Sequence, residues 1–200
     1  MGYIIRNSVL KKTLIDKLKL KKNVQFLTNQ ELINIKSSLN FINAVLTKFN
    51  VESKIIISAD GKNSFVRKLY NTPIYSKNYK HSAMVVNLDH SKDHKNIAYE
   101  LFFNSGPLAI LPMPSNTKSF FSSSVIWSNT NDYISNLQKL KPSLLIKILE
   151  EKIFKYTGNI IKIQDFGPFD LSAHLNTRFY EDRLIYVGDS AHSLHPIAGQ

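Results

Sequence analysis

Two short segments far apart in the chain carry the residue types that a nucleotide-like ligand requires. Asp60-Gly61 follows the apolar run 54–59, and Gly188-Asp189 follows a second apolar run. A carboxylate at the end of a buried strand accepts hydrogen bonds from sugar or polyol hydroxyls, and a neighbouring glycine lets a ligand approach the backbone. Each segment predicts one wall of a ligand site, although an aspartate that merely caps a strand-to-helix turn would have the same local sequence.

The residues that follow these two corners add features of anion binding. Arg67 lies on the short helix expected after the first corner, where it could face a phosphate. After the second corner, Pro196 stiffens the loop, and the amides of Gly199 and Gln200 would open a helix. Amides at a helix N-terminus point toward an anion or an electron-rich ring.

Two other chemistries use residue types that are present at the second corner. Asp189, Ser190, His192 and His195 include the types of a hydrolase triad, and the aspartate with the two histidines could bind a metal. Ser190 lacks the flanking glycines of a nucleophile elbow, and the His-x-x-His pair has no clear third ligand. We therefore expect neither a catalytic triad nor a metal site.

Composition narrows the classes of function. The 200 residues carry a net charge of +11, which comes mostly from lysines scattered along the chain. No nucleic-acid recognition motif accompanies this charge, so we expect no nucleic-acid partner. The lack of cysteine excludes disulfides and thiolate metal sites, and no apolar run is long enough to span a bilayer. We expect a cytoplasmic protein, with peripheral contact with the inner face of a membrane left open.

Hydrophobic periodicity predicts the elements that must position the two corners. Helices are expected at 7–18, 64–70, 133–140 and 143–156. Strands are expected at 3–5, 24–28, 32–35, 41–49, 54–59, 83–88, 97–103, 108–113, 120–127, 160–164, 169–175 and 184–187. The four successive strands in the middle favour an antiparallel sheet inserted into a mixed α/β region.

The strand-like stretch 106–114, which contains three prolines, could line an apolar pocket. Simple sheet core is the alternative for any one of its residues. Aromatic residues that lie nearby in the sequence could share that pocket; they are Phe102, Phe103, Phe120, Phe121 and Trp127.

Taken together, the two corners resemble those of the flavin-dependent aromatic-ring hydroxylases, above all the ubiquinone-biosynthesis branch related to p-hydroxybenzoate hydroxylase. Asp60-Gly-x-x-Ser64-x-Val-Arg67 is similar to the family's Asp-Gly motif. Gly188-Asp189-x-Ala191-His192-x-x-His195-Pro196-x-Ala198-Gly199-Gln200 is similar to its second FAD motif. The resemblance covers essentially the whole chain.

The resemblance implies a fold and a domain division. The fold would be α/β, with a partial Rossmann-like FAD-binding domain interrupted by an antiparallel-sheet substrate domain. Residues 1–72 and 179–200 would belong to the FAD-binding domain, and residues 73–178 to the substrate domain.

The resemblance also implies a reaction and its ligands. NAD(P)H would reduce FAD, and one atom of O₂ would be transferred to the ring of a prenylated phenol or quinol. Asp189 would bind the ribityl chain, and Pro196, Gly199 and Gln200 would lie along the flavin and the pyrophosphate. Asp60, Gly61 and Arg67 would serve FAD and NAD(P)H. Gly188 belongs to the second FAD motif with Asp189, and Asn7 would touch FAD. The resemblance implies no catalytic side chain.

One departure from the family bears on cofactor affinity. The chain has no Gly-x-Gly-x-x-Gly loop for the FAD pyrophosphate, so we expect a central part of such an enzyme that by itself binds FAD weakly or not at all. Its partners would then include a complementary segment or other ubiquinone-biosynthesis proteins. The alternative is a non-catalytic remnant or partner-binding module of a split flavoprotein.

Overall fold

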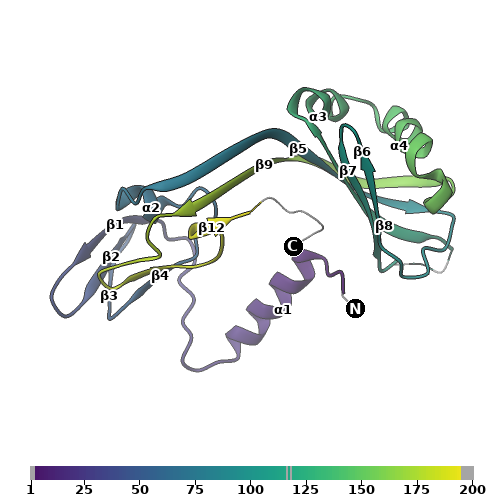
Figure 1. The fold of residues 1–200 in the computed structure, drawn as a ribbon. Coiled ribbons are helices and arrows are strands. Elements are labelled where there is room, and N and C mark those ends of the chain that lie inside the picture. The colour runs from purple at the N-terminus through teal and green to yellow at the C-terminus, as the bar shows by residue number, and fades with distance from the viewer. Residues whose placement is uncertain (1–2, 116, 118, 195–200) are drawn as a thin grey trace. The chain divides into compact units, whose positions relative to one another are not determined.

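The computed structural model describes residues 3–115, 117 and 119–194, which form two compact units (Figure 1). Residues 3–10 and 78–171 form the first, here called the sheet unit. Residues 11–77 and 172–194 form the second, called the corner unit because it holds both corners, Asp60-Gly61 and Gly188-Asp189. The division into FAD-binding and substrate domains that the resemblance implies stays a prediction.

The sheet unit is built on antiparallel strands. β8 (Phe121–Thr130) lies between β5 (Ile74–His90) and β7 (Gly106–Met113), and β6 (Tyr99–Phe103) pairs with the far side of β7. β9 (Ile160–Asn176) lies on the other side of β5. The four successive strands expected in the middle of the chain are therefore confirmed as an antiparallel sheet.

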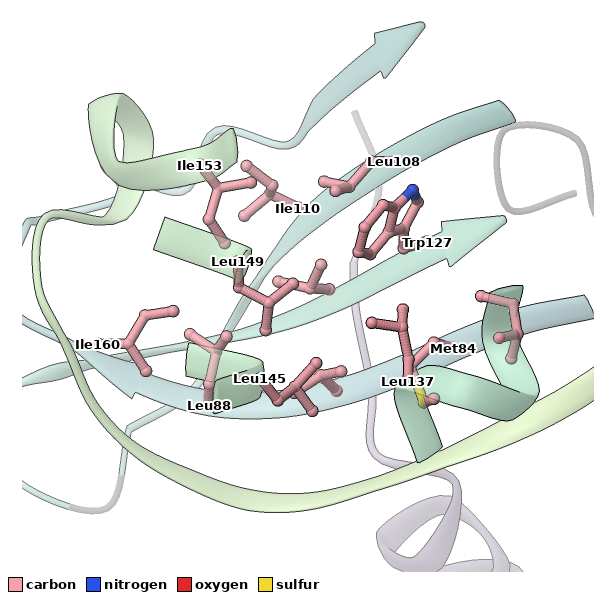
Figure 2. Packing of buried hydrophobic residues seen from close by; sticks show 13 residues of the cluster. Met84, Leu88, Leu108, Ile110, Trp127, Leu137, Leu145, Leu149, Ile153 and Ile160 are labelled. Carbon is pink, nitrogen blue, oxygen red and sulfur yellow. The ribbon is translucent and has the colours of Figure 1, made fainter. Parts of the chain in front are cut away.

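Two helices cover one face of this sheet (Figures 1 and 2). Thr130 caps α3 (Asn131–Gln138), and α4 (Pro142–Thr157) begins at a proline, whose missing N–H is harmless in the first turn. Alternate strand residues point toward the helices, because successive side chains of a strand face opposite sides. The resulting core comprises Met84, Val86, Leu88, Leu108, Ile110, Val125, Trp127, Ile134, Leu137, Leu145, Leu149, Ile153 and Ile160.

The corner unit contains two small sheets. β1 (Leu32–Ser37), β2 (Ile42–Leu46) and β3 (Asn50–Ser53) form an antiparallel sheet. β11 (Leu184–Tyr186) pairs in parallel with β4 (Ile56–Ser58) and antiparallel with β10 (Tyr180–Glu181). α2 (Phe65–Leu69) follows β4, and β12 (His192–Ser193) pairs with the end of β9. The buried hydrophobic residues are Ile35, Ile42, Val66, Leu184, Tyr186 and Ala191.

Two elements expected from the sequence are not formed. Residues 3–5 and 24–28 are not strands, because neither run has a partner strand in the described part of the chain to satisfy its backbone groups. The expected helix α1 (Asn7–Lys19) is confirmed, but none of its residues is buried. No helix in the described ranges combines the length and the apolar character that a bilayer crossing requires.

Two strands are longer than the sequence indicates. The first half of β5 is exposed and carries lysines and polar residues, so it has no apolar alternation to reveal it. β9 continues through Gly167-Pro168, where two separate strands were expected. At that point its only partner strand in the described residues is β5, and a proline is tolerated on a strand edge that has no partner.

Candidate functional site

The two corners, Asp60-Gly61 and Gly188-Asp189, lie next to each other in the corner unit. β4 and β11 pair in parallel, with Ile56 opposite Leu184 and Ser58 opposite Tyr186. Because parallel strands end at the same edge of a sheet, the chain leaves both strands on one side. The Val187 amide continues the pairing by donating to the Ser58 carbonyl at 2.9 Å. Two segments about 130 positions apart in the sequence thus form one surface.

Both corner glycines adopt a backbone conformation that disfavours other residues. Gly61 has a φ of 82° and Gly188 a φ of 59°. A Cβ atom built on either glycine would have no neighbour within 4 Å. The glycines are therefore required by the turn and not by crowding, and the surface beside each carboxylate is open.

Asp60 is held in place by its own turn. Ser58 Oγ donates to Oδ1 at 2.8 Å, and the Val66 amide donates to Oδ2 at 3.1 Å. Burial raises the pKa of Asp60, but hydrogen bonds from Ser64, the Val66 amide and Ser58 outweigh it and lower the pKa below its ordinary value. Asp60 is thus an anion whose orientation is fixed by its own turn.

Asp189 differs from Asp60 in that no group in the described part of the chain holds its carboxylate. It lies in the 3₁₀ turn Gly188–Ser190 directly after β11, and its side chain is exposed. In the described part of the chain no hydrogen bond or ion pair engages its carboxylate. A free carboxylate at the end of a strand is suited to accept hydrogen bonds from ligand hydroxyls.

Arg67 points into the protein. Its side chain is only 8% exposed. Nη2 donates to the Lys62 carbonyl at 2.6 Å, and Nη1 lies 3.1 Å from the Ser190 carbonyl and 3.2 Å from His174 Nε2. Arg67 therefore ties the helix after the first corner to the turn of the second. The expectation that it faces a phosphate stays a prediction, and both of its terminal nitrogens already have protein acceptors.

Three residues support this link; His174 and Asn176 carried no signal of a role in the sequence, and Ser190 appeared there only as a residue type of a triad. His174 receives a hydrogen bond from Arg67, and its Nδ1 lies 3.0 Å from Ser193 Oγ. Asn176 Nδ2 donates to the Ser190 carbonyl at 3.1 Å. Ser190 Oγ lies 2.6 Å from the Ser58 carbonyl and is fully buried, so it is a structural hydroxyl and not an exposed nucleophile. Only the fold brings them together.

The remaining expected site residues are not placed at these corners by the described structure. Asn7 opens α1 and belongs to the sheet unit, so its contact with FAD stays a prediction. His195, Pro196, Gly199 and Gln200 lie outside the described residues.

The sheet unit has an apolar pocket of about 490 Å³ on the face opposite its helices. Pro107, Ala109 and Leu111 line it, as the stretch 106–114 suggested. Trp127 does not, because it points to the helical face and belongs to the core. None of the four phenylalanines expected nearby lines the pocket either; β9 supplies Phe169 instead.

Comparison with known proteins identifies relatives along the whole chain. The family model described as an FAD binding domain matches residues 3–200. Ubiquinone hydroxylase UbiL of Rhodospirillum rubrum is 29% identical, over 100% of this chain and 46% of that protein. The 3-demethoxyubiquinol 3-hydroxylase of Escherichia coli is 26% identical, over 100% of this chain and 50% of that protein. The chain spans about half the length of the curated relatives it matches.

Solved structures share the fold. The flavin-dependent halogenase CmlS superposes with a TM-score of 0.78 at 15% identity, over 98% of this chain and 37% of that one. The probable FAD-dependent monooxygenase pqsL of Pseudomonas aeruginosa gives 0.76 at 16% identity, over 96% of this chain and 54% of that one. These neighbours bear out the expected fold class.

Proposed function

The chain belongs to the FAD binding domain family, in its branch of ubiquinone-biosynthesis aromatic hydroxylases, and we propose that it forms part of an FAD-dependent monooxygenase acting on a ubiquinone precursor. The observation that carries the proposal is the meeting of the two motif corners at one sheet edge. FAD is the family's cofactor, and NAD(P)H would be its reductant.

The residues of the corner unit fit a flavin nucleotide. Asp189 offers an unpaired carboxylate for the ribityl hydroxyls, and Asp60 offers a carboxylate that is already oriented by Ser58 and Val66. The open surface at Gly61 and Gly188 would let a ligand approach the backbone. In this proposal Arg67 positions the two corners and does not contact the phosphates itself.

When bound, FAD would supply the oxygen chemistry of the hydroxylation. The protein would orient the ring and exclude water. We propose the pocket of the sheet unit for the ring, because its walls are mostly apolar and its volume suits a small aromatic molecule. A prenylated phenol or quinol would reside in a bilayer, and the net charge of +11 would favour peripheral contact with an anionic membrane surface.

A chimera tests the reaction directly. Residues 3–200 of this chain would replace the matching segment of the Escherichia coli 3-demethoxyubiquinol 3-hydroxylase, in a strain that lacks that enzyme. We expect the purified chimera to carry FAD and the strain to regain ubiquinone, measured by mass spectrometry. An FAD-loaded chimera that forms no hydroxylated product would contradict the proposed substrate, and a folded chimera without FAD would contradict the proposed cofactor site.

A further inference from the structure

The pocket of the sheet unit owes its space to small side chains. Ala83, Ala98 and Ala109 line it on three different segments of the sheet unit. A sheet face normally carries larger residues, and on the opposite face of these strands Met84, Leu108 and Ile110 fill the core. The pocket therefore follows from the sequence of each strand, in which small side chains on the pocket face alternate with large side chains on the core face.

Two polar side chains interrupt this apolar surface. Glu100 on β6 is paired with Ala109 on β7, and Ser128 on β8 is paired with Ala83 on β5. These registers place both side chains on the pocket face, and both line the pocket. Ser128 is only 8% exposed.

Neither polar side chain has a partner in the described part of the protein. No hydrogen bond or ion pair there engages the Glu100 carboxylate or the Ser128 hydroxyl. A ligand that enters the pocket covers both groups, and a covered polar group is costly unless it is hydrogen-bonded. The pair therefore fits a ligand that brings a hydrogen-bond donor into an otherwise apolar pocket.

We propose that Glu100 and Ser128 determine which aromatic ring this site accepts. Glu100 accepts a hydrogen bond from a neutral ring hydroxyl, and Ser128 bonds the same or an adjacent oxygen. A ring carboxylate is rejected, because it would set two negative charges against each other at an apolar wall. The proposal rests on the proposed function, since it takes this pocket as the ring site.

Ligand binding by the whole chain, without FAD or NAD(P)H, tests the proposal. The probes are 4-pentylphenol, which is neutral at pH 7, and 4-pentylbenzoate, which is charged but carries the same alkyl group. Titrations followed by ligand-observed NMR give both dissociation constants. We expect the wild-type chain to bind the phenol about tenfold more tightly than the benzoate.

Substitutions at the two polar positions should change this preference. We expect Glu100→Gln to weaken the phenol and tighten the benzoate, each by roughly fivefold. We expect Ser128→Ala to weaken the phenol by about threefold. Glu151→Gln on the exposed face of α4 and Ser124→Ala on the same face of β8 are the matched controls, and neither residue lines the pocket. Ala109→Leu should weaken both ligands because it fills the pocket.

Several outcomes would overturn the proposal. The first two are equal affinities of the wild-type chain for the two probes, and a Glu100→Gln variant with an unchanged ratio of the two dissociation constants. The others are an Ala109→Leu variant that binds both probes as the wild-type chain does, and tighter binding of 4-pentylbenzylammonium than of 4-pentylphenol. None of these measurements requires flavin. If the chimera is active but the wild-type chain does not prefer the phenol, only the proposed role of Glu100 and Ser128 is refuted. If the chain prefers the phenol but the chimera forms no hydroxylated product, only the proposed reaction is refuted.

Discussion

Asp60 and Asp189 occupy matching positions at the ends of neighbouring strands but differ in their surroundings. Asp60 is held by its own turn, whereas the Asp189 carboxylate is exposed and unpaired in the described structure. An unpaired carboxylate costs the fold little to lose. Substitution of Asp189 should therefore change the affinity for a ligand without changing the stability of the fold.

We expect Asp189→Asn to weaken FAD binding by about tenfold, since hydrogen bonds to a charged group contribute about 1.5–3 kcal/mol. Its unfolding temperature should equal that of the wild-type chain. A flavin fluorescence titration extended to high FAD concentration measures the affinity. Asp16→Asn, on the exposed surface of α1, is the control. Equal FAD affinities of Asp189→Asn and wild type would remove Asp189 from the site.

Gly188 gives a second prediction at this scale. A residue with a Cβ pays about 1–2 kcal/mol in the left-handed conformation that Gly188 adopts, so Gly188→Ala should lower the free energy of unfolding by that amount. Gly167→Ala is the matched control, because a Cβ there also meets nothing within 4 Å and the backbone is not left-handed. Urea unfolding compares the two variants, and equal effects would contradict the conformational argument.

At the scale of elements, one buried hydrogen-bonded chain joins α2, β9 and the turn after β11. Arginine can only donate, so His174 must accept at Nε2 and carry its proton on Nδ1. Burial, followed by the charge of Arg67, lowers the pKa of His174. In the sheet unit, burial similarly lowers the pKa of His90, whose Nδ1 faces the Thr157 carbonyl. Both histidines are therefore neutral at pH 7 in the folded protein.

These shifts predict how stability depends on pH. A histidine whose folded pKa lies below its unfolded value of about 6.5 binds its proton first in the unfolded chain, so stability is lost as pH falls below that value. Each histidine contributes at most about 1.4 kcal/mol per pH unit. We expect the unfolding temperature to fall between pH 7.5 and 5.5, and the double variant His90→Gln/His174→Gln to fall less steeply. A wild-type unfolding temperature that is flat over this range would contradict the assignment.

The sequence predicts a helix or strand well where its apolar residues are periodic and another element packs against or pairs with it. The helices of the sheet unit and its middle strands were predicted because apolar residues recur on one face. Residues 24–28 are apolar enough for a strand, but no local signal tells whether a partner strand exists. The exposed half of β5 shows the reverse case, since its pairing is not accompanied by burial.

The candidate site was predicted in the same uneven way. The corners at Asp60 and Asp189 are visible in the sequence because a strand, a glycine and an acid follow one another. The inward direction of Arg67 is not, because it depends on a carbonyl 123 positions away. His174 and Asn176 gave no signal for the same reason, and the pocket depends on the pairing of five strands, β5 to β9.

At the scale of the whole molecule, the chain has two separate candidate sites. The corner unit presents the two carboxylates at one edge, and the sheet unit presents a pocket with an apolar wall and the carboxylate of Glu100. A monooxygenase of this family requires a flavin site and a ring site, and the chain has a candidate for each. Its relatives are about twice as long, so the reaction of the complete protein is a proposal.

Hydrogen–deuterium exchange with and without saturating FAD reports both corners in one experiment. We predict that FAD slows exchange at residues 58–64 and 187–191 together, and that Asp189→Asn shifts the FAD concentration required at both segments equally. Protection of only one segment, or of neither, would contradict the claim that the two corners form a single flavin site.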